Sequence, residues 1–309
     1  MFGKVFCALL ALASTACTTA SASDAEQEPV AIPADQQAFL DACEPWDKWD
    51  KPAPPFKIYG NTYYVGTCGI ASILILGDGE HILIDSGTEK GAETVLRNIK
   101  TLGVDPKEIE FLAYSHEHFD HVGGHATIQE ATGASVTARK QIAPVFETGV
   151  VLPNDPQFGM HEPMAPVRMG LILDSLKGLS VTGLSIRAIE TPGHSPGAMT
   201  WYWQECEERC ETIVYADSLS PVSRDDYKFS DHPQYLTEYR TGLARLKRLE
   251  RQGCSVLLTP HPSHNRMLKR MQAGNLIQNA PGDTPCKDYA ADKVADIKKR
   301  LLKEQAETP

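Results

Sequence analysis

Four side chains able to bind a metal ion lie within six consecutive residues of this 309-residue chain. They belong to the stretch His116-Glu117-His118-Phe119-Asp120-His121. Residues two apart in an extended chain face the same way, so His116 and His118 can converge on one ion. Asp120 and His121 lie where the chain turns toward two glycines, and they can face a neighbouring point. The spacing therefore predicts two half-sites for metal ions.

Each half-site is short of ligands, because a catalytic zinc ion takes three protein ligands and a water molecule. Two histidines elsewhere in the chain can complete the sites. His194 lies in the loop Thr191-Pro192-Gly193-His194-Ser195-Pro196-Gly197, and His261 follows an apolar stretch that ends at Thr259. Both follow predicted strands, at the edge where a sheet presents side chains. The remaining histidines lack such company and are interpreted as core or surface residues: His81, His125, His161, His232 and His264.

The elements that must position these residues alternate between strands and helices. Strands are predicted over residues 56–59, 62–66, 70–76, 81–85, 109–115, 134–137, 179–189, 197–204, 212–216 and 254–259, and helices over 89–102, 122–132, 138–148, 235–250 and 288–304. Residues 149–168 are proline-rich and lack any period, which predicts a long loop. The pattern indicates one α/β domain without internal repeats.

Three segments are expected along the chain: a secretory signal over 1–22, an N-terminal extended segment over 23–55, and the α/β domain over 56–309. The signal is indicated by Lys4, a short apolar run and a small-residue cleavage site. Three prolines between residues 52 and 55 argue against regular helix in the second segment. In an alternative interpretation, Cys17 carries a lipid anchor.

Composition and charge narrow the function. The chain is 42% apolar and 23% charged, as in an ordinary globular protein. Its net charge of −10 lacks the basic face that a nucleic-acid partner requires. After residue 22, no stretch approaches the roughly 18 apolar residues that a membrane-spanning helix needs. A soluble periplasmic or secreted protein, acting as a monomer, is therefore expected.

Six cysteines remain after the predicted signal, and an even number in an oxidising compartment suggests disulfides. Their grouping along the chain favours the pairs Cys43–Cys68, Cys206–Cys210 and Cys254–Cys286. The alternative is that some remain free thiols. Cys254, which opens an apolar run, is then the one most easily explained as a buried side chain.

The six-residue motif, the later Thr-Pro-Gly-His and the final strand-end histidine resemble the metallo-β-lactamase superfamily. The resemblance extends from about Phe56 to Cys286, and it implies a four-layer αβ/βα sandwich of two β-sheets flanked by helices. Within the superfamily, the segment Ala216-Asp217-Ser218-Leu219-Ser220 is similar to the third subclass of class B β-lactamases. A serine there stands where the first subclass has a metal-binding cysteine. The pair Cys254 and Cys286 and the stretch Asp155-Pro156-Gln157-Phe158-Gly159 also resemble that subclass.

The resemblance implies two Zn²⁺ per chain, one on His116, His118 and His194, the other on Asp120, His121 and His261. Water between two such ions ionises near neutral pH and can attack a carbonyl. Asp120 would also orient this attacking group and so act in catalysis. The expected reaction is hydrolysis of the β-lactam amide in penicillins, cephalosporins or carbapenems. Contacts to this small-molecule substrate are expected from Ser218, Ser220, Gln157 and Tyr227.

Asp217 leaves alternatives open. In related thioesterases and lactonases, an aspartate in the corresponding segment bridges both metals, so a dizinc thioesterase or lactonase is the second interpretation. We favour a structural or orienting Asp217, because Ser218 matches the lactamase pattern. Asp85 is expected to hydrogen-bond a ligand histidine from behind. A protein that binds zinc without turnover is the third interpretation, and it is disfavoured because three ligands per ion leave room for water.

Overall fold

A computed structural model describes residues 1, 31–173, 178–278 and 280–307. The chain divides into a unit up to Val30 and a compact unit from Ala31 to Pro309, and the fold lies in the second. The predicted signal, Met1 apart, and Cys17 lie outside the described residues. Within the described part, no helix is both long and apolar enough to cross a membrane.

Two mixed sheets form the centre of the compact unit. The strands are β1 Phe56–Tyr59, β2 Thr62–Tyr64, β3 Ile73–Leu76, β4 His81–Ile84, β5 Ile109–Ala113, β6 Ser135–Arg139, β7 Met169–Leu173, β8 Leu179–Val181, β9 Leu184–Glu190, β10 Met199–Cys206, β11 Cys210–Tyr215 and β12 Cys254–Leu258. The seven-stranded sheet has the order β1 to β7, antiparallel up to β4 and parallel from β4 onward. The five-stranded sheet has the order β12-β11-β10-β9-β8, in which only β11 and β12 are parallel.

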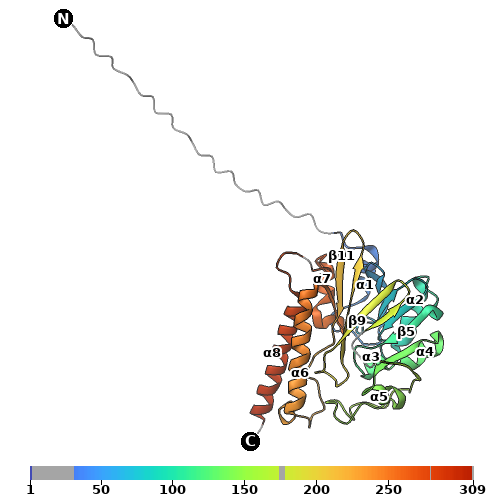
Figure 1. Cartoon of the computed structure of the whole chain (residues 1–309), viewed down its shortest axis with the longest axis vertical. Helices are drawn as coiled ribbons and strands as arrows, with labels where there is room; N and C mark the ends of the chain where they lie inside the picture. Colours follow the sequence, from blue (N-terminus) through green and yellow to red (C-terminus); the bar gives the residue numbers. More distant parts are fainter. Residues whose placement is uncertain (2–30, 174–177, 279, 308–309) are drawn as a thin grey trace. The chain divides into compact units, whose positions relative to one another are not determined.

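Helices cover the outer faces of both sheets (Figure 1). They are α1 Ala34–Ala42, α2 Gly91–Thr101, α3 Phe119–Val122, α4 His125–Thr132, α5 Ala143–Thr148, α6 Pro233–Arg248, α7 Met267–Gln272 and α8 Pro285–Ala306. On one side, α6 contacts β9 and α8 contacts β12; on the other, α4 contacts β5 and β6. One core cluster fills the space between the sheets and under α2, and a second lies between the five-stranded sheet and the pair α6 and α8. This confirms the expected αβ/βα sandwich.

Three elements differ from their predicted bounds, and glycines or contacts with a neighbouring strand explain the differences. The helix expected over 122–132 is two helices, α3 and α4, separated by Gly123-Gly124. The strand expected over 179–189 is the hairpin β8–β9, which turns at Gly183 in the left-handed region. The helix expected over 138–148 begins only at Ala143, because Ala138 and Arg139 continue β6 in parallel with β7.

Within the described part of the segment over 23–55, Ala34–Ala42 form helix α1, and the expectation of extended chain is wrong for these residues. The prolines that argue against helix follow α1 rather than interrupt it. Phe39 of α1 has no exposed surface and packs edge-on against Phe56 and Tyr64, with ring centroids 4.9 and 5.0 Å away. Helix α1 therefore packs on the core.

Three disulfides join the described cysteines in the predicted pairs, Cys43–Cys68, Cys206–Cys210 and Cys254–Cys286. The first ties the end of α1 to the loop after β2, and the third ties β12 to α8. Because cytosolic thiols are kept reduced, these bonds indicate an extracytoplasmic protein.

Candidate metal centre

The candidate ligands gather where strands of both sheets end. The His116–His121 stretch follows β5, His194 lies between β9 and β10, and His261 follows β12. The main-chain N–H of Met199 donates to the carbonyl of Ser115 at 2.7 Å, which fixes the start of β10 beside the end of β5. The topology therefore brings together side chains from three separated stretches.

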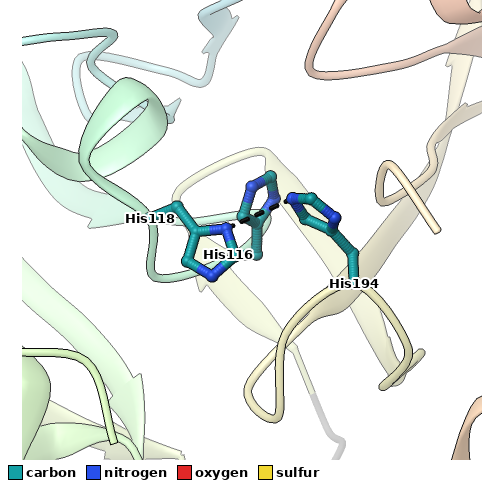
Figure 2. A group of neighbouring side chains, drawn as sticks. All are labelled: His116, His118 and His194. Carbon is teal, nitrogen blue, oxygen red and sulfur yellow. Dashed lines mark hydrogen bonds between the residues drawn. The ribbon is translucent and has the colours of Figure 1, made fainter. Parts of the chain in front are cut away.

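His116, His118 and His194 form one set of converging imidazoles (Figure 2). Nδ1 of His118 lies 3.2 Å from Nε2 of His194. The His116 ring centroid lies 4.5 Å from that of His194 and 4.9 Å from that of His118. Nε2 of His116 is buried and has no hydrogen-bond partner in the described chain. One nitrogen of each ring is thus available at a common point.

The other nitrogen of each ring is held by an acceptor. Nε2 of His118 lies 3.0 Å from a carboxylate oxygen of Asp155. Nδ1 of His194 donates to the main-chain carbonyl of Ser220 at 2.8 Å. Nδ1 of His116 lies 3.3 Å from the Ser115 hydroxyl oxygen and 3.0 Å from Oδ1 of Asp217, and only the Ser115 contact has the geometry of a hydrogen bond. Such contacts fix the tautomer and orientation of a metal-binding imidazole.

Asp120, His121 and His261 form the second set. Oδ2 of Asp120 lies 3.0 Å from Nε2 of His121 and 3.3 Å from Nε2 of His261, and the two nitrogens are 3.3 Å apart. Asp85 lies behind, with Oδ2 3.7 Å from Nδ1 of His121. This distance is too long for the hydrogen bond expected between Asp85 and a ligand histidine. Asp85 instead accepts hydrogen bonds from Ser115 and from the Tyr215 hydroxyl.

Both sets fit a metal ion. Two nitrogens that each lie about 2.0–2.1 Å from a tetrahedral zinc ion are about 3.3 Å from each other. The measured separations of 3.0–3.3 Å match this spacing. The sets overlap at His116, which also groups with Asp120 and His121 with ligand atoms within 4.8 Å. The arrangement therefore forms two candidate sites of a dinuclear centre.

The electrostatics favour cations at this place. Five carboxylates with 6% exposure or less surround the histidines, namely Asp85, Glu117, Asp120, Asp155 and Asp217. No lysine or arginine of the described chain forms an ion pair with any of them. Buried negative charge without a cationic partner is costly. Two divalent ions would supply the missing positive charge.

Titration behaviour follows from this burial. Burial, with the neighbouring histidines, lowers the pKa of His116 and of His194 well below the usual value, so both imidazoles are neutral, as metal ligands must be. Burial opposes a charge on Asp120 as well, yet His121 and His261 hold its pKa well below the ordinary range. Burial raises the pKa of Asp217 to about 8.

The four side chains expected to contact substrate have different surroundings. The Gln157 amide nitrogen lies 3.3 Å from Nδ1 of His118 and 3.5 Å from Nε2 of His194, and Ser220 Oγ lies 3.1 Å from Nδ1 of His194. Ser218 has no exposed surface, and its hydroxyl has no partner in the described chain. Tyr227 is buried, stacks on His232 and belongs to the core cluster beneath α6 and α8.

A hollow of about 230 Å³ opens beside His118. The long loop over 149–168 supplies most of its lining, including Val150, Gln157 and Phe158. Phe119 and His161 complete it with ring centroids 4.2 Å apart. His161, expected to have no special role, thus lies at the rim of the site.

Two buried acids at the site were not singled out from the sequence. In the sequence, Asp155 belongs to the stretch that resembles the third subclass, and its position two residues before Gln157 is the signal that both side chains can reach one site. Glu117 lies inside the histidine motif, and its carboxylate accepts hydrogen bonds from the His194 loop. Carboxylates are frequent in loops, so residue type alone does not reveal this role.

Comparison with known proteins agrees with the fold and the site. The model of the metallo-β-lactamase superfamily matches residues 65–207. The structure is similar to that of the MIM-2 metallo-β-lactamase, with 44% identity, a TM-score of 0.82, and coverage of 89% of this chain and 100% of that one. The structure is also similar to that of MIM-1 from Novosphingobium pentaromativorans, with 41% identity, a TM-score of 0.82, and coverage of 88% of this chain and 100% of that one. MEM-A1, a subclass B3 metallo-β-lactamase from a soil metagenome library, is similar with 31% identity, a TM-score of 0.78, and coverage of 84% of this chain and 100% of that one.

Fold, site and relatives together define a metal-dependent hydrolase. More particularly, the chain belongs to the metallo-β-lactamase superfamily, and its structural relatives at 31–44% identity are metallo-β-lactamases, among them the subclass B3 enzyme MEM-A1.

Curated relatives are more distant. A ribonuclease of Thermus thermophilus is 28% identical over 49% of this chain, and a β-lactamase-like protein 2 homolog of Caenorhabditis elegans is 26% identical over 63%. The matches span 35% and 54% of those two proteins.

Proposed function

We propose that this protein is a dizinc β-lactamase that hydrolyses the lactam amide of penicillins, cephalosporins or carbapenems in the periplasm or outside the cell. The observation that carries the proposal is the pair of buried ligand sets, with donor atoms spaced for zinc, in a chain 44% identical to a metallo-β-lactamase over that protein's whole length. The export signal over 1–22 is part of the proposal, and the three disulfides support it.

In this proposal His116, His118 and His194 hold one ion, and Asp120, His121 and His261 hold the other. Bound zinc would supply a Lewis acid for the lactam carbonyl and lower the pKa of water. The chain itself supplies orientation. Asp120 stays ionised because His121 and His261 lower its pKa, so its carboxylate can accept a hydrogen bond from the attacking water.

Gln157 is the polar side chain best placed to meet a substrate, because its amide nitrogen lies 3.3 Å from Nδ1 of His118 and 3.5 Å from Nε2 of His194, the nitrogens that face the common point. Ser220 stays in the proposal as a contact beside the other face of His194, where its Oγ lies 3.1 Å from Nδ1. Ser218 and Tyr227 stay in the proposal as contacts that would require a side chain or the loop to move, since both are buried. The position of Asp217 behind His116 supports the lactamase over a thioesterase or lactonase with a bridging aspartate.

The test is a substrate panel. Purified protein is assayed on a carbapenem, a lactone and a thioester, each with and without a chelator. Chelator-sensitive loss of the carbapenem is expected. If the carbapenem survives while the lactone or thioester is consumed, the β-lactamase assignment is wrong and the second interpretation replaces it.

Metal analysis tests the ligand assignment separately. The protein should hold two zinc ions per chain, and His121→Ala should hold one, because the second set loses one of its three ligands. An unchanged zinc content in His121→Ala would overturn the assignment of that residue.

A further inference from the structure

Glu117 is a buried carboxylate whose neighbours in the chain, His116 and His118, are both candidate ligands. It has no exposed surface. One of its oxygens accepts a hydrogen bond from the Ser195 hydroxyl at 2.6 Å, and the other accepts from the main-chain N–H of Gly197 at 2.8 Å. Glu117 therefore joins the loop that carries two ligands of the first set to the loop that carries the third, His194.

The contact between these loops is tight. A Cβ added to Gly197 would lie 2.6 Å from Oε2 of Glu117 and 2.6 Å from Cγ1 of Ile142. Glycine at this position lets the carboxylate reach the backbone, and a larger residue would displace one or the other. The position of Glu117 relative to His194 is thus determined by packing as well as by hydrogen bonds.

Glu117 differs from the other buried carboxylates of the site in its partners. Asp85, Asp120, Asp155 and Asp217 each lie within 3.7 Å of a histidine nitrogen, but Glu117 has no ion-pair partner in the described chain. Two neutral donors are the compensation that the structure gives it. Leaving a carboxylate buried in this way is costly unless a cation lies nearby. The first ligand set consists of three imidazoles and brings no negative charge to a divalent ion.

We propose that Glu117 is a positioning residue for the metal ion held by His116, His118 and His194. Its carboxylate holds the His194 loop in register with the other two ligands through the hydrogen bonds from Ser195 and Gly197. The inference rests on the dinuclear centre of the proposed function, but it is independent of the identity of the substrate.

The test compares Glu117→Gln with Glu205→Gln. Glu205 is a matched control because its carboxylate is also buried and also accepts from one main-chain N–H, that of Asn61, and one hydroxyl, that of Thr62, far from the candidate ligands. Zinc affinity is measured by competition with a chromophoric chelator, and the unfolding temperature is measured with and without zinc.

Glu117→Gln should bind the first ion about 10–100-fold more weakly, the usual effect of losing a contact just outside the ligands. Its unfolding temperature without zinc should be close to that of the wild type, because the amide that replaces the carboxylate still accepts one of the two hydrogen bonds. Glu205→Gln should bind zinc as the wild type does. Equal zinc affinity in Glu117→Gln, or an equal fall in its unfolding temperature with and without zinc, would overturn the proposal, since the residue would then be only a structural link.

If Glu117→Gln does not fold, Ser195→Ala removes one of the two bonds while leaving the charge. First-ion affinity should then fall about 2–10-fold, the effect of one lost hydrogen bond. An unchanged affinity would contradict the inference. Failure of the substrate panel leaves this measurement unaffected, so the two proposals are distinguished.

Discussion

The segment after β11 shows how single residues hold the first ligand set. Leu219 adopts the left-handed conformation, with φ of 46°, which is rare for a residue with a side chain. Its N–H donates to Asp217 at 2.9 Å, and its carbonyl accepts from the Tyr239 hydroxyl. The turn places the Asp217 carboxylate behind His116 and the Ser220 carbonyl behind His194. Backbone strain here is maintained because two ligands depend on it.

Asp217→Asn should weaken binding of the ion held by His116, His118 and His194 about 10–100-fold, because Asp217 orients His116 and is not a ligand in our assignment. The other ion should stay bound. Zinc titration with elemental analysis of the dialysed protein measures this. Loss of both ions together would mean that Asp217 bridges them.

The sequence was sufficient for the residues whose types are uncommon and closely spaced. Histidines at positions 116, 118 and 121 stand out in any chain, and the two distant histidines follow strands, so their convergence could be predicted. Asp155 and Glu117 could not be assigned in this way, because their roles depend on contacts between distant parts of the chain. Asp155 contacts His118, which lies 37 residues earlier. Glu117 accepts a hydrogen bond from Ser195, which lies 78 residues later.

At the scale of elements, α1 shows where local patterns fail. Most strands of the two sheets are predictable, because apolar and β-branched residues alternate with turn residues over short distances, but no strand is predicted where β7 lies. Helix α1 has a weakly amphipathic sequence with only Gln36 and Phe39 buried, so its formation depends on contacts with β1 and β2. Similarly, β7 is largely exposed and takes its conformation from pairing with β6.

Phe39→Ala should therefore lower the free energy of unfolding of the whole domain by about 3–5 kcal/mol, as expected for a buried phenylalanine. Denaturant titration followed by far-UV circular dichroism measures the change. The exposed Gln37 of α1 provides the control, because Gln37→Ala should change stability by no more than about 0.5 kcal/mol. Equal, small effects would show that α1 is not part of the core.

Helix α8 is linked to the Phe229–Asp231 turn through Glu304. Its carboxylate accepts from the N–H groups of Phe229 and Ser230 at 3.0 and 2.9 Å and from Arg300 at 2.6 Å. Burial opposes the charge, but these donors together lower the pKa of Glu304 below its ordinary value of 4.5. A lowered pKa stabilises the folded state above pH 4.5, and this contribution is lost as the pH falls through the lowered value.

Glu304→Gln should accordingly destabilise the protein by about 1–3 kcal/mol at pH 7, and the difference from the wild type should shrink below pH 4.5. Urea titrations of both proteins from pH 7 to pH 3 measure this. A difference that does not depend on pH would mean that the charge of Glu304 is unimportant.

At the scale of the whole molecule, the disulfides close loops of very different length. Cys254 and Cys286 are 32 residues apart, Cys43 and Cys68 are 25 apart, and Cys206 and Cys210 only 4. Restricting the unfolded chain contributes more stability when the closed loop is longer. The bond between β12 and α8 therefore matters more to the domain than the bond at the β10–β11 hairpin.

Replacing Cys254 and Cys286 together by alanine should cost about 3–4 kcal/mol, against about 2 kcal/mol for Cys206 and Cys210. Comparison of the denaturant midpoints of the two double variants shows which disulfide contributes more to stability. The reverse order would show that native packing around the cysteines, and not loop closure, determines their contribution.

The distribution of the ligands between two sheets has a consequence for how the enzyme is made. The unfolded chain has no pocket that could retain an ion, because the donor atoms from residues 116 to 261 meet only after both sheets have formed. Both metal sites are therefore completed only by folding, and the metal-loaded fraction depends on the supply of metal in the compartment where the chain folds.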